Sequence, residues 1–366
     1  MGKNKKHSII LLFAGLIVIV MILFLIIGFD GRKNDTKKVG FILSGGATED
    51  GWNGMHYRGM KAACDNTDVD LLVEENVPEF SGQCEMAVRD LEAAGCQMIV
   101  LSSYGYSEEV KELVREYPEV VFYGNSSEHH EENLTSYFVK MYQARYLAGI
   151  VAGRMTENNQ IGYVAAMNNN EVNRGISAFT LGVQRVNPDA VVTVVFTGTW
   201  DDEVKEKEAA RKLIQNTGVD LLTYHQNQTY VVEVAEEAGI YSIGYHESSQ
   251  KFSERYLTAV KCDWQQVYKV LVQEFLKGKA NSIENFWIGM DTGAVALAEF
   301  SPMVPDSVKK EVEAAQKEII NGKEIFSGAI YDTEGVVQCV EGEVISDERL
   351  LEQFDWLARG VELYEE

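Results

Sequence analysis

Cysteine is scarce in this chain, and its placement excludes two classes of architecture. The 366 residues contain five cysteines, at positions 64, 84, 96, 262 and 339. An odd number without close spacing predicts neither a disulfide framework nor a structural zinc site. We expect these side chains to be small, buried and apolar. One pair could be oxidised, but the spacing does not indicate which.

Positive charge is also scarce, and the imbalance narrows the class of partner. The chain has 33 Lys and Arg against 56 Asp and Glu, a net charge of -23. Residues 1–38 carry seven Lys or Arg and two Asp, a balance of +5, which leaves -28 for the remainder. A segment with this much negative charge repels nucleic acid and anionic lipid. We therefore predict no nucleic-acid partner.

Recognisable catalytic and metal-binding motifs are absent. There is no G-x-S-x-G, no Walker-type phosphate loop and no H-E-x-x-H. Asp50, Asp201, Asp202 and Asp291 could supply carboxylates to a nucleoside hydrolase, but no base, nucleophile and orienting group fall together. Asp201 and Asp202 open a helix, where carboxylates cap free N–H groups. We therefore predict no enzymatic activity and no cofactor.

A metal site is likewise not predicted. Four side chains of the second half of the chain are the best candidates for ligands: His225, His246, Glu247 and Cys262. Their spacing matches no known metal site, so we expect none.

Long apolar runs are limited to the N-terminus. Ser8 to Phe29 is 22 residues without a charge, which as a helix would span roughly 33 Å. A cleaved signal peptide has a shorter apolar region and a small-residue cleavage site, and a lipoprotein anchor needs a cysteine. We predict an uncleaved single-pass membrane anchor with the remainder on the extracytoplasmic side. Basic residues on both flanks leave the orientation open on charge alone.

The rest of the chain repeats an apolar strand, a turn and a helix. One set of strands starts at residues 38, 69, 97 and 119, and a second set at 160, 190, 219 and 240. The intervals are nearly equal in the two sets, which indicates two similar lobes. Continuous apolar strands separated by helices favour parallel sheets covered on both faces. The later segments break this rhythm, with a hairpin near 326–345 and a short helix over 348–364, so the chain should cross between the lobes more than once.

Ligands of open parallel sheets bind at the carboxyl ends of the strands, so we expect the binding residues in the loops that follow the strands. The first such loop holds Asp50, Trp52 and Asn53, and the loop "TGTWDDE" of the second set holds Trp200. Each tryptophan alone could be a plug at the edge of its own core. Two at matching ends of two sheets favour a paired aromatic clamp for a flat, uncharged ligand such as a nucleobase or nucleoside.

Several long segments resemble the basic membrane protein family of ABC-transporter substrate-binding proteins, in its purine-binding branch. They include "DGWNGMHYRGMKAA", "ENLTSYFVKMYQARYLAGIVAG", the stretch from "IGYVAAMNNNEVNRG" to "NTGVDLL", and "FWIGMDTGAVALAEF". The resemblance covers about residues 38–328. It implies a type I periplasmic-binding fold, with two Rossmann-like lobes, a three-strand hinge and a ligand in the cleft.

The same resemblance implies the site and the partners. Trp52 and Trp200 would sandwich the base, and polar contacts would fall near Asn53, Tyr104, Gln226, Asn227, His246, Trp264 and Asp291. The family pattern after the third strand of lobe 2 is closer to H-T-D-S than to the "HQNQT" found here, which leaves the exact base open because Gln226 or Asn227 can donate or accept. Family members deliver nucleosides or purine bases to a permease and an ATPase.

These expectations give a specific domain assignment and function. Residues 1–37 form the anchor and linker, 38–142 with about 250–287 form lobe 1, about 143–249 with about 288–345 form lobe 2, and 346–366 form a C-terminal helix. The predicted function is a membrane-anchored solute-binding protein that feeds a purine base or nucleoside to an ABC importer. The alternative is a ligand-sensing receptor ectodomain that signals to a membrane partner.

Overall fold

The computed structural model describes residues 36–364, except for 50, 66, 128, 130, 247–249 and 279–284. The predicted membrane helix at Ser8–Phe29 lies outside these residues. Among the helices that the structure describes, none is long and apolar enough to cross a bilayer.

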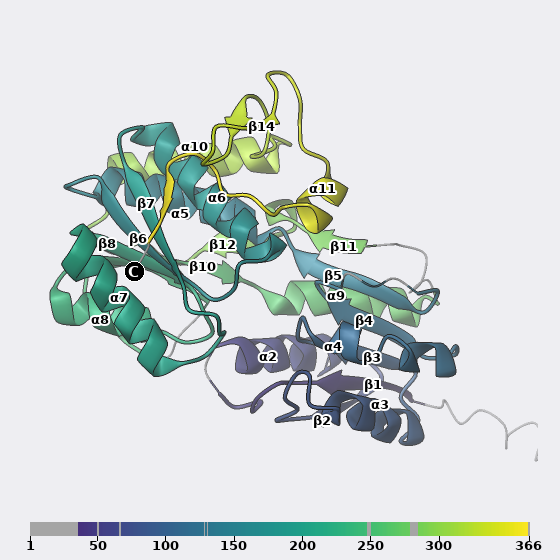
Figure 1. Cartoon of the computed structure of the whole chain (residues 1–366). Helices are drawn as coiled ribbons and strands as arrows, with labels where there is room; N and C mark the ends of the chain where they lie inside the picture. The colour runs from purple at the N-terminus through teal and green to yellow at the C-terminus, as the bar shows by residue number, and fades with distance from the viewer. Residues whose placement is uncertain are drawn as a thin grey trace, which may run out of the picture.

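Two separate sheets form the centres of two lobes (Figure 1). The first has the order β11-β5-β4-β3-β1-β2 and all its neighbouring strands are parallel. Its strands are β1 (Lys37–Ile42), β2 (Val69–Glu74), β3 (Met98–Leu101), β4 (Val121–Asn125), β5 (Leu134–Val139) and β11 (Asn285–Ile288).

The second sheet has the order β12-β10-β9-β8-β6-β7-β15 and is parallel except for the β10–β12 pair. Its strands are β6 (Gln160–Ala165), β7 (Val191–Phe196), β8 (Leu221–His225), β9 (Tyr241–Tyr245), β10 (Tyr256–Cys262), β12 (Val295–Leu297) and β15 (Val361–Leu363). The predicted α/β class with parallel sheets is therefore confirmed.

Helices cover both faces of each sheet, as the continuous apolar strands require. Along β3, Met98 and Val100 pack into one core while Ile99 and Leu101 pack into another. In lobe 1, α3 (Gln83–Ala93) and α4 (Tyr106–Glu109), with the 3-10 turn η1 (Leu113–Glu116), cover one face, and α2 (Trp52–Asp65) and α9 (Trp264–Leu276) pack together on the other. In lobe 2, α7 (Glu203–Thr217) and α8 (Tyr230–Ala238) lie opposite α5 (Met141–Met155), α6 (Asn170–Val186) and α10 (Asp306–Ile320).

Helix α6 shows how the sequence specifies such an element. Its apolar residues recur at intervals of three or four, and Val172, Ile176, Phe179 and Val183 are fully buried. The Asn169 side chain caps the first turn by accepting a hydrogen bond from the Val172 amide at 3.0 Å. Gly182 faces the helix α5, because a Cβ there would lie 2.0 Å from the Tyr146 carbonyl oxygen. The close neighbour of this glycine is therefore another helix and not a sheet.

The chain crosses between the lobes three times. β5 of the first sheet leads into α5 of lobe 2, β10 of the second sheet leads into α9 of lobe 1, and β11 returns through the 3-10 turn η2 (Met290–Thr292) to β12. Consequently β10 belongs to lobe 2, whereas the predicted segment 250–287 placed it in lobe 1. It pairs with β9 and β12, and its side chains Leu257 and Val260 are buried in the hydrophobic core.

The C-terminal segment contains a short helix and a strand, whereas a single helix was predicted over 346–366. The hairpin β13 (Ile330–Tyr331) and β14 (Val337–Cys339) precedes α11 (Asp347–Glu352), as the hairpin pattern predicts. Residues 361–363 then form β15, which adds a parallel strand at the edge of the second sheet beside β7. The helix prediction fails there because backbone hydrogen bonding to an existing sheet edge overrides local helical preference.

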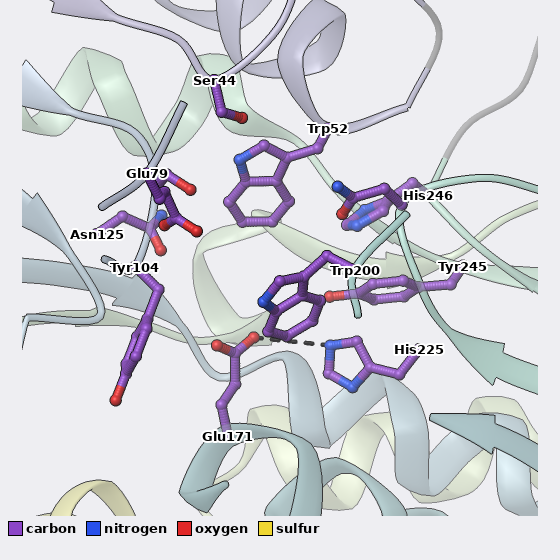
Figure 2. A pocket seen from close by; sticks show the side chains of 12 residues that line it. Ser44, Trp52, Glu79, Tyr104, Asn125, Glu171, Trp200, His225, Tyr245 and His246 are labelled. Atoms are coloured by element: carbon purple, nitrogen blue, oxygen red, sulfur yellow. Dashed lines mark ion pairs between the residues drawn. The ribbon is translucent and has the colours of Figure 1, made fainter. Parts of the chain in front are cut away.

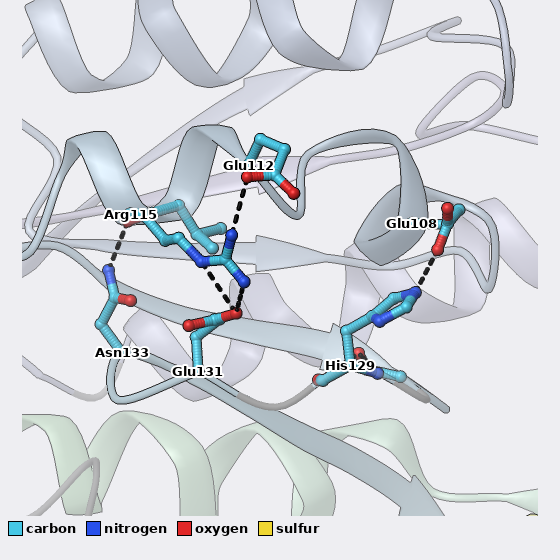
Figure 3. A network of polar contacts seen from close by, with 8 residues as sticks. Glu108, Glu112, Arg115, His129, Glu131 and Asn133 are labelled. Carbon is cyan, nitrogen blue, oxygen red and sulfur yellow. Dashed lines mark hydrogen bonds and ion pairs between the residues drawn. The ribbon is translucent and has the colours of Figure 1, made fainter.

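An exposed polar network joins η1 to the connection between β4 and β5 (Figure 3). Arg115 contacts Glu112 at 2.7 Å and Glu131 at 2.5 Å, and His129 contacts Glu108. Beside these exposed ion pairs, the buried Asn133 side chain donates to the Val114 carbonyl at 2.8 Å. Solvated ion pairs of this kind contribute little stability individually, so the network is a surface feature of lobe 1.

Candidate ligand-binding site

A cleft lies between the lobes, at the carboxyl ends of the strands of both sheets (Figure 2). Lobe 1 contributes Ser44, Trp52, Glu79, Ser103, Tyr104 and Asn125. Lobe 2 contributes Glu171, Trp200, His225, Asn227, Tyr245 and His246. The empty volume is about 550 Å³, part of which opens to solvent. This is the position at which open α/β sheets bind small molecules.

Trp52 is held in a fixed orientation at the start of α2. Its indole N–H donates to the Ser102 carbonyl at 3.1 Å, which ties the ring to the end of β3. One side of the ring packs on His56, with centroids 4.0 Å apart, and Trp264 lies edge-on at 5.4 Å. The ring is only half-buried, so part of it remains available to the cleft.

Trp200 faces the same space from lobe 2, on the loop between β7 and α7. Its carbonyl accepts from the Asn227 amide at 2.9 Å, which joins this loop to the loop after β8. The indole meets the His225 ring edge-on at 5.8 Å. Like Trp52 it is half-buried. Both tryptophans therefore line one cleft, one from each lobe.

Several side chains of the cleft lining are buried and carry unpaired polar atoms. No hydrogen-bond partner is found among the described residues for Asn125 Nδ2, His225 Nδ1 or the two ring nitrogens of His246. His246 has a φ of 69°, a left-handed conformation that is strained for a side chain of this size. Buried polar atoms without partners are costly, so these positions suit a ligand with complementary donors and acceptors.

Burial favours the neutral form of the cleft histidines. Burial lowers the pKa of His225 to about 4, and the nearby Arg145 guanidinium acts in the same direction against the opposing effect of Glu171. Burial also holds the pKa of His246 well below its ordinary value. Glu171 Oε1 lies 3.7 Å from His225 Nε2. A neutral imidazole can donate and accept at once, which favours recognition of an uncharged ligand.

The structure brings together half of the predicted site residues. Trp52, Trp200, Tyr104, Asn227 and His246 all line the cleft. Two of the others lie directly behind this lining. Trp264 is buried and packs on the His56 ring, with centroids 3.7 Å apart, and buried Gln226 donates to Thr197 Oγ1 at 2.8 Å.

Two further predicted residues lie outside the cleft lining, and one cannot be placed. Asn53 pairs with Ser44 Oγ at 3.1 Å, because the first turn of α2 directs it toward the loop after β1. Asp291 is exposed in η2, at the third crossing between the lobes. Asp50 lies outside the described residues.

Sequence reasoning missed several lining residues. Asn125, His225 and Tyr245 are the last residues of β4, β8 and β9, so attention to the strand ends as well as the loops would have found them. Ser44 follows β1 in the same way. Glu79 and Glu171 carry no such signal, because one lies in a long connection and the other in the first turn of α6.

The aspartates after Trp200 have structural partners. Asp202 is the N-cap of α7 and accepts from the Lys205 amide at 3.1 Å, as predicted. Asp201 accepts from Gln228 Nε2 at 3.1 Å. Among the residues that the structure describes, no group of three His, Cys, Asp or Glu is placed to hold a metal ion. All five cysteines are free and buried, as expected.

The chain is similar to substrate-binding proteins of ABC transporters. The family model described as "ABC transporter substrate-binding protein PnrA-like" matches residues 36–328. A purine-binding protein of Brucella abortus is 32% identical over 338 residues, which cover 91% of this chain and 95% of that protein. A protein of Haloferax volcanii named as an ABC transporter glucose-binding protein is 31% identical over 85% of this chain and 77% of its own length.

Solved structures share the fold. A transcriptional activator of the comK gene from Bacillus halodurans superposes with a TM-score of 0.68 at 27% identity, covering 78% of this chain and 98% of that one.

Proposed function

The chain belongs to the PnrA-like family of ABC transporter substrate-binding proteins, and on that premise we propose that it captures a purine base or nucleoside between its lobes. One observation carries the proposal: Trp52 and Trp200 approach one cleft from different lobes. Two indole faces suit a flat bicyclic ring, and stacking on an aromatic side chain contributes roughly 1–3 kcal/mol per base. The Brucella relative named for purine binding supports the same choice.

The polar lining suits an uncharged ring with donors and acceptors at its edge. Glu171 and Asn227 lie near the indoles, and the neutral imidazoles of His225 and His246 supply either role. The strongly acidic chain disfavours nucleotides, whose phosphates would be repelled.

The wider role proposed is delivery to an ABC importer. Ligand binding draws the lobes together, and the closed form is the one that a permease and its ATPase recognise. The apolar segment Ser8–Phe29 is proposed to tether the binding domain to the cell membrane, on its extracytoplasmic side. Uptake of a labelled nucleoside by cells with and without this gene tests the transport role, because a sensor would leave uptake unchanged.

The second candidate, a sensor, keeps the same ligand but changes the output. It is supported by the similarity to a protein titled as a transcriptional activator, which shares the fold at 27% identity. In this case closure of the lobes would signal to a membrane partner without moving solute.

Calorimetric titration of the full chain in mild detergent tests the ligand. Adenine, guanine, hypoxanthine and their nucleosides form one panel, and glucose is added because a relative is named for it. A ligand at 100 times its Kd should also raise the free energy of unfolding by about 2.7 kcal/mol. Binding of glucose but of no purine compound would replace the proposal with a sugar-binding role.

A further inference from the structure

A small cavity lies where the chain first crosses between the lobes, from β5 into α5. These two elements supply apolar walls together with Arg145, and α6 and β8 supply Glu171, Arg174 and His225. The cavity has an empty volume of about 230 Å³, part of which opens to solvent. It shares Glu171 and His225 with the tryptophan-lined cleft, but Arg145 is not part of the cleft lining. Two arginines in one small cavity are unusual in so acidic a chain.

Arg145 brings a buried positive charge to this cavity. Its side chain is 1% exposed, and its Nη1 donates to the Tyr224 carbonyl at 2.9 Å. The central carbon of the guanidinium lies 4.0 Å from the centre of the Tyr245 ring, a cation–π contact. Buried charges in proteins are normally paired with an opposite charge. No carboxylate of the described residues forms an ion pair with Arg145, so its charge lacks a counter-ion within the part of the chain that the structure describes.

The unpartnered nitrogens of Arg145 lie along one edge of the guanidinium. Neither Nε nor Nη2 has a hydrogen-bond partner among the described residues. The N–H groups of these two atoms point in the same direction, which is the fork that binds anions in a bidentate manner. Nη1 is already bonded to Tyr224, and Arg145 lines the cavity, so the fork is the edge that is available to a bound group.

The charged groups around the cavity leave an excess of positive charge. Arg174 is also buried, and its guanidinium donates to the Leu350 carbonyl. Glu171 is the carboxylate of the cavity lining, and its Oε1 lies 3.7 Å from His225 Nε2 (Figure 2). Burial, followed by the charge of Arg145, lowers the pKa of His225 to about 4, which favours the neutral imidazole. Two guanidinium groups against one carboxylate leave one positive charge, which a single monovalent anion would neutralise.

The donors and the walls of the cavity favour a small anion. The Arg145 fork supplies two N–H groups, and the side chains of Phe138 and Val139 in the wall are apolar. A phosphate carries roughly two charges near neutral pH and more acceptor oxygens than this fork can satisfy. A compact ion with one charge needs few donors and tolerates apolar neighbours.

We propose that Arg145 Nε and Nη2 bind a small monovalent anion, with chloride as its simplest form, at the first crossing between the lobes. The ion completes the pairing of a charge that the fold buries. It also holds the guanidinium against Tyr245, which lines the ligand cleft. This anion site is separate from the purine-binding function, and it stabilises the folded chain whether or not a purine is bound.

Equilibrium unfolding of the full chain in mild detergent, without any purine, tests the site. Potassium chloride replaces potassium gluconate at constant ionic strength, since the apolar walls disfavour a polyhydroxylated anion. Once chloride exceeds its Kd, each tenfold rise in its concentration should raise the ratio of folded to unfolded chain about tenfold, as one bound ion requires. A ratio that does not depend on chloride would overturn the proposal.

Two arginine variants of α5 locate the ion. Arg145→Lys keeps the positive charge but removes the fork, so the dependence on chloride should be lost. Arg154→Lys is the matched control, because Arg154 lies in the same helix and already pairs with both carboxylate oxygens of Glu311, at 2.9 and 3.0 Å. It should keep the full dependence. If Arg145→Lys responds to chloride like the unaltered chain, the ion binds elsewhere and the assignment is wrong.

Bromide decides the question even where Arg145→Lys fails to fold. Crystals of the full chain grown with bromide in place of chloride should show anomalous scattering beside Arg145 Nε and Nη2. A water molecule alone at this position would contradict the proposal. Purine binding is measured separately by the titrations described above, so a failure of the anion site leaves the proposed function standing, and the reverse also holds.

Discussion

Trp200 is the residue on which the binding site depends most directly. Replacing it by alanine removes one face of the clamp, so we expect purine affinity to fall by at least roughly tenfold, the equivalent of one lost stacking contact. The unfolding midpoint should change little, since the ring is half-buried at the edge of the core. Phe252→Ala is a control at another half-buried aromatic of lobe 2, outside the cleft lining. A large loss of stability with Trp200→Ala would instead identify a core plug.

His225 should make the empty protein sensitive to acid. Its pKa is lowered to about 4 by burial, below the ordinary value of 6.5, so the unfolded chain binds the proton more readily. Stability is therefore full above pH 6.5 and is lost as the pH falls toward 4, on the order of 3 kcal/mol from this group. Denaturant titrations between pH 4 and 7.5 should show a shallower loss for His225→Gln. If the free energy of unfolding of His225→Gln falls with pH as steeply as that of the unaltered chain, this imidazole does not bind a proton on unfolding.

At the residue scale the sequence identifies the clamp better than the polar lining. Trp52 and Trp200 could be located because each follows an apolar strand, and an indole in such a loop is unusual. Glu171 and Glu79 could not be found in this way, because glutamate is ordinary in the first turn of a helix and in a long connection. Trp264 and Gln226 were assigned to the ligand, yet neither is part of the cleft lining: Trp264 meets Trp52 edge-on, and Gln226 donates to Thr197.

Helices α5 and α6 approach each other closely at Gly182. Alanine is the better helix former by about 1 kcal/mol, so propensity predicts stabilisation by Gly182→Ala. The structure predicts the opposite, because the new Cβ would meet the Tyr146 carbonyl oxygen at 2.0 Å. We expect a loss of roughly 1–3 kcal/mol in the free energy of unfolding, the usual cost of overpacking.

Gly175 provides the matched control for this element. It lies in the same helix, and its Cβ would have an ordinary contact of 3.5 Å with His225. Gly175→Ala should therefore be neutral or mildly stabilising in denaturant titrations. If both substitutions stabilise the protein, there is room for a methyl group at Gly182 between α5 and α6, and the expected overpacking does not occur.

At the element scale, periodicity predicts the alternation of helices and central strands well. It fails where the outcome depends on a distant partner. β10 is an apolar strand that either lobe could use, and only its pairing with β9 and β12 decides the matter. β15 has three residues and exists because the edge of β7 is available. Neither partner can be inferred from the local pattern.

At the scale of the whole molecule, the lobes meet at the mouth of the cleft, and this contact tests closure. A Cβ on Gly51 of lobe 1 would lie 2.6 Å from the Asn227 carbonyl oxygen of lobe 2. Gly51→Ala should therefore hinder closure, lower purine affinity and leave a larger radius of gyration in solution scattering at saturating ligand. The positive φ of 81° adds local strain, which must be separated from the closure effect.

Gly95→Ala makes that separation, since Gly95 of lobe 1 has a similar φ of 85° and open space around its Cβ. Both variants should lose comparable stability, roughly 1 kcal/mol, from backbone strain. Only Gly51→Ala should weaken binding and enlarge the liganded form, because only its new methyl group stands between the lobes. Equal affinities for the two variants would mean that the lobes bind ligand without approaching to this distance, and that closure is not the signal read by a membrane partner.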